Sequence, residues 1–349
     1  NSYADEKSAS ATFLTSDPAV TVGLRYNKGS ASAVGYLNYI EMNATRMLTM
    51  SGSQMSFRSA SCSGVGSVTD FTLNGNGQSL QIWDVTNGGN VKRLAATQSG
   101  ANYTFRVETD TLREFIAFDG TTFRAPEFVG KVENQDLHST PSTDYVIVCH
   151  PSFLDQAERL AEFHRTHSGL SVFITTPQKI YNEFSSGAQD ITAIRDFMRM
   201  LYNRAEPGSE PKYLLLFGDA SYDYKDRIAN NSNFVPAYEA AESLSPTDSY
   251  VTDDYFVLLD TDEGQSAYGT MDAGVGRFPV SSEEQAREAV DKVIHYCSGT
   301  DPVKNDWRNV ITFVADDQNE GGNMFVQDSE SFAATIESKF KDYNVDKIY

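Results

Sequence analysis

Apolar and polar residues alternate along most of residues 11–128, with the period of two that is typical of half-buried strands. The clearest examples are VTVGLRY (20–26), MSFRSAS (55–61), SLQIWDV (79–85), NYTFRVE (102–108) and EFIAF (114–118). Asn-Gly and Asp-Gly steps separate them at residues 74–77, 87–90 and 119–120, as antiparallel hairpins require. We therefore expect an all-β, sandwich-like domain over residues 1–135, in which residues 33–48 fit either a long strand or a different element.

The period changes after a polar connector at residues 132–144. Short, continuously apolar strands now alternate with amphipathic helices. The expected strands are 145–149, 171–175, 213–217, 273–278, 310–315 and 345–349, and the expected helices are 153–164, 191–202, 283–296 and 329–340. This alternation predicts a mainly parallel, doubly wound α/β sheet over residues 136–349. Ligands of such sheets bind beyond the carboxyl ends of the strands.

The last expected strand coincides with the end of the chain at Tyr349. A buried parallel strand needs neighbours and covering helices on both faces, so we expect the sheet to be incomplete and the chain to be the first part of a longer protein. The domain boundary is expected between residues 128 and 144, where the composition is polar.

Net charge narrows the classes of partner. Lys and Arg number 28 against 48 Asp and Glu, for a net charge of −20. Such a chain repels a phosphate backbone, so nucleic acid is excluded as a partner. No apolar run approaches the roughly 18 residues that span a bilayer, and the first residues lack the features of a signal peptide. We therefore expect no transmembrane segment.

The three cysteines, Cys62, Cys149 and Cys297, stand far apart without a CxxC spacing, which excludes a zinc knuckle and suggests core thiols. Cys149 and His150 are consecutive in a strand and so point to opposite faces, which argues against a catalytic dyad. His295 and Cys297 are two apart on a helix and do not face each other, so a buried Cys beside a surface His is the preferred interpretation.

Two acidic segments are candidates for binding. Asp219 follows the strand at residues 213–217 in the sequence GDASYDY; it fits either a functional carboxylate at the sheet edge or the cap of the next turn. Farther on, Asp260-x-Asp262-x-Gly264 resembles part of a calcium loop, but position 12 is Met271 rather than Glu. Calcium binding therefore stays possible only through some other set of oxygen ligands. The sequence contains no GxSxG or Walker motif, so the hydrolase and nucleotide-binding classes that use them are not supported.

Several ordered motifs resemble the gingipain-like cysteine peptidases, over about residues 145–349. They are TAIRDFMRMLYNRA (192–205), YLLLFGDASYDYKDR (213–227), AGVGRFPVSSEEQAREAVDKVIHYCSG (273–299) and ITFVADDQ to VDKIY (311–349). Upstream, residues 36–58 and 81–87 resemble the β-domain of the type IX secretion sortases in this family rather than that of the soluble gingipains.

The resemblance implies a caspase-like sheet, a Cys nucleophile and a His that generates its thiolate. Neither of the family's motifs for these residues occurs in the 349 residues, so the resemblance places both beyond Tyr349 and implies that this chain alone has no peptidase activity. No cofactor is required. For a sortase it also implies secretion to the cell surface or outer membrane, contact with outer-membrane secretion components, and substrates whose carboxy-terminal secretion domains are removed before transfer to lipopolysaccharide.

The resemblance further implies that Asp328 receives a basic P1 side chain of the substrate. Because the alignment needs a one-residue gap, Asp317 or Ser329 could take this place instead, and Asp328 could equally be a helix cap. A different class of function also stays open, that of a non-catalytic surface scaffold or adhesin with a pseudo-peptidase domain. A Cys and a His at the ends of the next two strands would decide for the peptidase.

Overall fold

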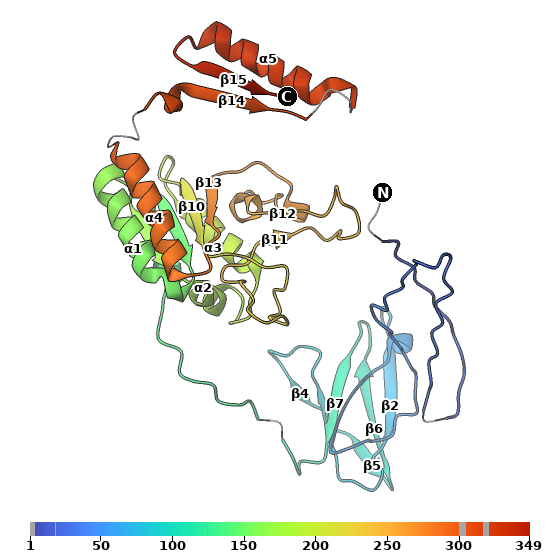
Figure 1. The fold of residues 1–349 in the computed structure, drawn as a ribbon. Helices are drawn as coiled ribbons and strands as arrows, with labels where there is room; N and C mark the ends of the chain where they lie inside the picture. Colours follow the sequence, from blue (N-terminus) through green and yellow to red (C-terminus); the bar gives the residue numbers. More distant parts are fainter. Residues whose placement is uncertain (1–3, 18, 124, 300–304, 317–320) are drawn as a thin grey trace. The chain divides into compact units, whose positions relative to one another are not determined.

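The computed structural model describes residues 4–17, 19–123, 125–299, 305–316 and 321–349, and the chain divides into two compact units (Figure 1). One unit is Thr12–Val132; the other combines Asn1–Ala11 with Glu133–Tyr349. Independent folding of two domains divided near residue 135 stays a prediction. No helix among the described ranges is both long and apolar enough to cross a membrane.

The first unit contains two antiparallel sheets. One has the order β1-β7-β3-β4, with β1 (Gln54–Arg58), β7 (Glu114–Phe118), β3 (Gln81–Asp84) and β4 (Lys92–Arg93). The other has the order β2-β6-β5, with β2 (Val68–Asn74), β6 (Asn102–Glu108) and β5 (Thr97–Ser99). A short 3-10 helix, η1 (Ala60–Cys62), precedes β2. The strands expected from alternation at residues 102–108 and 114–118 are thus present, and the one expected at 79–85 is present as β3. The strand expected at 55–61 ends at Arg58, because the chain turns into η1.

Both sheets contribute aromatic side chains to one core. The Phe71 and Phe105 rings of the second sheet stack with centroids 5.3 Å apart. Phe115 of the first sheet is fully buried and lies 5.0 Å from Phe71 and 5.3 Å from Phe105. Alternation of apolar and polar residues, as in β6, directs one face of each strand into this core.

The strand expected at residues 20–26 is not formed. The described residues of 4–47 contain neither helix nor strand, and most of their side chains are exposed. The first ladder contact is a parallel bridge between Thr49 and Asn74. Alternation predicts which side chains share a face, but a strand also needs a hydrogen-bonding neighbour, and none of the described residues supplies one here.

The second unit is built on a parallel four-stranded sheet with the order β13-β10-β8-β9. Its strands are β13 (Gly274–Phe278), β10 (Tyr213–Phe217), β8 (Tyr145–Cys149) and β9 (Val172–Thr175), and its helices are α1 (Leu154–Phe163), α2 (Pro177–Phe184), α3 (Ile191–Arg204) and α4 (Glu283–Ser298). In the register, Phe217 of β10 pairs with both Cys149 and Phe278. The predicted parallel sheet is confirmed for these strands.

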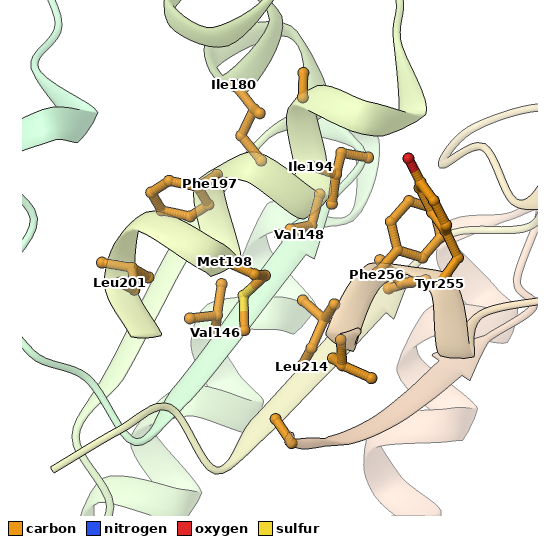
Figure 2. Packing of buried hydrophobic residues seen from close by; sticks show 14 of the residues in the cluster. Val146, Val148, Ile180, Ile194, Phe197, Met198, Leu201, Leu214, Tyr255 and Phe256 are labelled. Atoms are coloured by element: carbon orange, nitrogen blue, oxygen red, sulfur yellow. The ribbon is translucent and has the colours of Figure 1, made fainter. Parts of the chain in front are cut away.

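Apolar clusters cover both faces of this sheet. Val146, Val148 and Leu214 pack with α2 and α3 on one face, as Figure 2 shows. Ile147, Leu215 and Phe217 pack with α1 and α4 on the other. Because helices cover both faces, the strands are continuously apolar.

The helices begin where the sequence provides caps. The side chains of Thr176, Asp190 and Ser282 accept hydrogen bonds from the first-turn amides of α2, α3 and α4. Short elements complete the unit: η2 (Leu137–Ser139), η3 (Pro151–Phe153), the π-helix η4 (His164–Ser168), β11 (Tyr238–Glu239), β12 (Val251–Thr252), η5 (Asp254–Val257), η6 (Gln265–Ala267), η7 (Asp306–Asn309) and η8 (Gly321–Asn323).

The last expected strands form a sheet of their own. β14 (Val310–Val314) and β15 (Asn344–Ile348) pair in parallel, with α5 (Met324–Lys339) between them in the chain. The sequence predicts a single sheet that includes these strands, whereas in the described structure they bond to each other and not to β13. Periodicity identifies a strand but not its neighbour, which explains the difference.

The carboxylate of Glu183 ties the start of this unit to α2. It accepts hydrogen bonds from Gln135 Nε2 and the Leu137 amide, both at 2.7 Å, and contacts His138 Nδ1 at 2.7 Å. Burial raises the pKa of Glu183, but the bonds from Gln135, Leu137 and His138 outweigh it and lower the pKa to about 2. Because these donors favour the ionised carboxylate, it stabilises the attachment of residues 135–139.

Replacing Glu183 by glutamine is expected to lower the free energy of unfolding by about 2 kcal/mol at neutral pH. A folded-state pKa below the ordinary value means that this stabilisation is complete above about pH 4.5 and disappears as the pH falls toward 2. Urea unfolding at several pH values measures the difference. Glu206→Gln, at an exposed position, is the control, and an equal loss in both variants would contradict the prediction.

Candidate active site

The carboxyl ends of β8, β10 and β13 meet at one edge of the parallel sheet. Cys149, Phe217 and Phe278 are aligned in the register, so the residues that follow them lie next to one another. The amide of His150 donates to the Phe217 carbonyl, 3.1 Å away, and the Gly218 amide donates to the Phe278 carbonyl at the same distance. This is the edge at which parallel sheets bind ligands.

The backbone around Asp219 is held on both sides. Its amide donates to the Val280 carbonyl, and its carbonyl accepts from the amides of Phe234 and Val235, all at 3.0 Å. Gly218 has a φ of +153°, and a Cβ there would lie 2.9 Å from Phe234 Cβ. A side chain at position 218 would therefore disturb the position of Asp219.

The Asp219 carboxylate is half-buried and accepts no hydrogen bond from any residue that the structure describes. Among the described residues, Asp219 therefore does not cap the following turn, which was the alternative role for its side chain. Asp223, which is buried, does this instead, because its Oδ2 accepts from the amides of Arg227 and Ile228. The Asp219 side chain is thus free of internal partners within the described chain.

Arg277 fastens this edge together. Its guanidinium donates to both carboxylate oxygens of Asp253, at 2.7 and 2.8 Å. It also donates to the carbonyls of Gly218, Val235 and Pro236, at 2.8, 2.7 and 3.2 Å. These contacts use all five N–H groups of a side chain that is only 12% exposed. The segment that carries Asp219 is therefore held by a guanidinium in which every N–H group has an acceptor.

Sequence reasoning missed the roles of Arg277, Asp253 and Asp223. Arg277 stands in the GRF triplet of β13, where an arginine inside an otherwise apolar strand was the available signal. Asp223 stands four and five residues before the amides that it binds, which is beyond the two-residue reach of an Asx turn, so a local turn pattern does not reveal its role. Asp253 comes from a distant segment, and nothing local in the sequence indicates its partner.

Cys149 and His150 do not form a dyad. The Cys149 thiol is fully buried and directed at the carbonyl of His150, 3.2 Å away. Burial raises the pKa of this thiol to about 12, so it is not a thiolate near neutral pH. The His150 ring accepts at Nδ1 from the Ser152 amide and packs edge-on against Phe234; burial lowers its pKa.

The remaining cysteines correct one prediction. Cys297 is exposed on α4, as His295 is, so the interpretation of Cys297 as a buried thiol is wrong. Its position is on the solvent face of an amphipathic helix whose buried residues are Ala286 and Val290. Cys62 is half-buried, and its thiol donates to the Ser59 carbonyl.

Asp328 lies in the second turn of α5, on an exposed face between Phe325 and Phe332. The helix begins after Asn323 without a side-chain cap, so the alternative in which Asp328 caps its own helix is wrong. Ser329 is partly buried, and Asp317 lies outside the described residues. Asp219 follows β10 of the four-stranded sheet, whereas Asp328 lies in α5, between the two strands of the β14-β15 sheet in the chain. Their presence in one cleft stays a prediction.

A cation of the chain itself occupies the segment that resembles a calcium loop. The buried Arg195 donates to the carbonyl of Leu258 at 2.6 Å and of Glu263 at 2.7 Å. Its guanidinium also lies over the Tyr255 ring, 5.6 Å from the centroid. Within the described ranges, no three His, Cys, Asp or Glu residues are grouped so that they could hold a metal ion.

Comparison with known families identifies the class of protein that carries this sheet edge. The family model of peptidase family C25 matches residues 138–349, which include the whole parallel sheet and its edge. The chain belongs to peptidase family C25, the gingipain family of cysteine peptidases.

A solved relative extends the likeness into the first unit. The chain is 31% identical to dimeric latent PorU from Porphyromonas gingivalis, with a TM-score of 0.61. The match covers 71% of this chain and 25% of the PorU chain, so it spans about a quarter of that protein's length. None of the curated proteins compared matches the chain.

Proposed function

We propose that this chain is the N-terminal part of a secreted cysteine endopeptidase that acts as a type IX secretion sortase. The similarity to PorU, which covers 71% of this chain at 31% identity, carries this proposal. In the proposed reaction, the enzyme works at the cell surface with outer-membrane secretion components as partners. It removes the carboxy-terminal secretion domains of cargo proteins. The cargo is then joined to lipopolysaccharide.

The chemistry requires a nucleophile that Cys149 does not supply, because its thiol is buried and its pKa is raised. We assign the nucleophile and its base to a Cys and a His that follow Tyr349. The thiolate would attack the scissile carbonyl, and the leaving amine would take the proton from the His, which leaves a thioester. An acceptor amine would then attack the thioester and give up a proton to the now neutral His, so that an amide bond forms as the carbon–sulfur bond breaks and the thiolate is released.

Asp219 and Asp328 are the substrate-binding residues of this proposal. The Asp219 carboxylate has a fixed backbone and no internal partner within the described structure, at the edge where ligands bind. The Asp328 carboxylate is exposed. Either carboxylate can accept charge-assisted hydrogen bonds from an Arg or Lys side chain at P1.

In the full-length protein, Asp219→Asn or Asp328→Asn is expected to reduce kcat/KM for peptides with Arg or Lys at P1 by about tenfold or more, because a charge-assisted contact of roughly 1.5–3 kcal/mol is lost. Peptides with a neutral P1 residue should change little. Steady-state hydrolysis of matched peptides measures this, and the exposed Asp342→Asn serves as control.

Three outcomes would count against the proposal. Equal losses for basic and neutral P1 residues would remove the specificity role of the two carboxylates. Loss of thiol-dependent cleavage in Cys149→Ala, with the fold intact, would show that Cys149 is the nucleophile and that the assignment above is wrong. Complete absence of cleavage by the full-length protein would favour the non-catalytic surface scaffold.

A further inference from the structure

Three exposed aromatic side chains surround one cavity of the second unit. Tyr296 stands in the last turn of α4, Trp307 in η7, and Tyr343 directly before β15. They are 47%, 54% and 44% exposed and line a cavity of about 640 Å³, a volume within the roughly 300–1,000 Å³ of small-molecule sites. Single exposed aromatic residues are ordinary, whereas several around one cavity indicate a binding site.

The backbone fixes the walls of this cavity. β14 and β15 begin side by side in a parallel register, so Asn309 and Tyr343, which directly precede them, are neighbours. The turn of η7 is closed by the Arg308 amide, which donates to the Asn305 carbonyl at 3.2 Å. The side chains that line the cavity therefore project from an ordered backbone.

Aromatic rings and polar groups converge in the cavity. The Trp307 ring centroid lies 6.2 Å from that of Tyr296, and the Arg308 guanidinium lies over the Tyr296 ring, 4.7 Å from its centroid. Within the described chain, the Arg308 guanidinium makes no hydrogen bond or ion pair, and the side-chain amides of Asn305 and Asn309 make none either. These donors and acceptors are thus free to bind a ligand.

This combination of groups matches a carbohydrate. The C–H groups on one face of a pyranose ring are weakly positive, so they stack on the electron-rich face of an aromatic ring. The sugar hydroxyls both donate and accept hydrogen bonds. An asparagine amide offers two donors and an acceptor, and a guanidinium offers donors in a fixed plane.

Other ligands fit these groups less well. A nucleic-acid base could stack on the rings, but the net charge of −20 repels its phosphates. An apolar peptide would cover the side chains of Asn305, Arg308 and Asn309 without giving them hydrogen-bond partners, which costs free energy.

We propose that Tyr296, Trp307, Arg308, Asn309 and Tyr343 form a carbohydrate-binding site, whose ligand is a pyranose unit of a glycan. The sugar face stacks on the Trp307 ring, and its hydroxyls bond to Arg308 and Asn309. The site lies at the amino ends of β14 and β15, whereas the substrates of parallel sheets bind at the carboxyl ends. A glycan would bind here whether or not the chain is part of a peptidase, so this site is independent of the proposed function.

The tryptophan of the site supplies a direct test. Trp83 and Trp307 are the two tryptophans of the chain, so Trp83→Phe leaves Trp307 as the only tryptophan reporter. An array of neutral and acidic oligosaccharides first identifies the sugar that the 349-residue chain binds best. Titration of the Trp83→Phe variant with this oligosaccharide should change the Trp307 emission and protect it from quenching by acrylamide, as stacking on the ring requires.

Substitutions test which side chains hold the sugar. Trp307→Ala and Tyr296→Ala should each weaken its binding by about tenfold or more in isothermal titration calorimetry. Arg308→Lys keeps the charge but loses the planar donors, and should weaken it by about threefold to tenfold. Tyr268→Ala, at an 85% exposed tyrosine outside the cavity, is the matched control and should change it by less than about twofold. None of these side chains belongs to an apolar core, and circular dichroism verifies the fold.

Failure to bind any oligosaccharide of the array would overturn the proposal. Binding that Trp307→Ala and Tyr296→Ala leave unchanged would overturn it as well, because the sugar would then be held elsewhere. Binding by the 349-residue chain that the full-length protein lacks would show that residues after Tyr349 cover the cavity, again against the proposal. Peptide cleavage bears on the proposed peptidase and not on this site, so the two can fail separately.

Discussion

Replacement of Arg277 by methionine is expected to lower the free energy of unfolding of the second unit by about 3–5 kcal/mol. The methionine keeps much of the apolar stem but removes all five donors. Asp253 would be left as a poorly solvated carboxylate without its partner, and the carbonyls of Gly218, Val235 and Pro236 would lose their donors. Removal of one member of a buried pair costs more than the pair contributes, because the other charge stays buried.

Arg287→Met is the matched control, because this arginine is half-exposed and its ion pair with Asp291 lies on the surface of α4. We expect it to change stability by less than about 1 kcal/mol. Chemical unfolding followed by tryptophan fluorescence and circular dichroism measures both variants. Similar changes in the free energy of unfolding for Arg277→Met and Arg287→Met would show that the Arg277 guanidinium does not stabilise the sheet edge.

Replacement of Phe115 by alanine is expected to destabilise the first unit by about 3–5 kcal/mol. Phe115 is fully buried and touches the rings of Phe57, Phe71 and Phe105, with centroids 5.0–5.3 Å apart. Its removal leaves a cavity between the two antiparallel sheets, whose backbones limit collapse. The thermal midpoint of this unit should fall by about 10–20 °C.

Scanning calorimetry can resolve the two units in the same experiment. If they fold independently, Phe115→Ala should move one transition and leave the other in place. Phe128→Ala is the control, since its side chain is 85% exposed. A single transition that moves as a whole would show that the units unfold together, against the predicted division near residue 135.

The sequence predicts the parallel sheet well because its strands and helices carry the information locally. The run YVIVC at Tyr145–Cys149 is apolar on both faces, and it lies between helices in the structure. The amphipathic pattern and the Asp190 cap likewise locate α3. Local pattern fails where pairing decides the outcome, as for residues 20–26, or for β14 and β15, which pair with each other.

The site is less predictable than the fold for a related reason. Asp219 could be singled out because it follows a buried strand directly. Its backbone position, however, depends on Arg277 and through it on Asp253, which are 24 residues apart and joined only by tertiary structure. The choice of Asp223 over Asp219 as the turn cap depends on backbone geometry that residue types alone do not determine.

The position of Arg195 has a consequence for how the segment between η5 and η6 closes. An exchangeable ion must be recruited from solution, so its occupancy follows its concentration. A guanidinium that is part of the chain is present at a fixed stoichiometry and at a high effective concentration, and α3 already orders its backbone. The carbonyls of Leu258 and Glu263 therefore accept hydrogen bonds from a cation that is covalently part of the chain, and we expect their ordering to accompany the docking of α3.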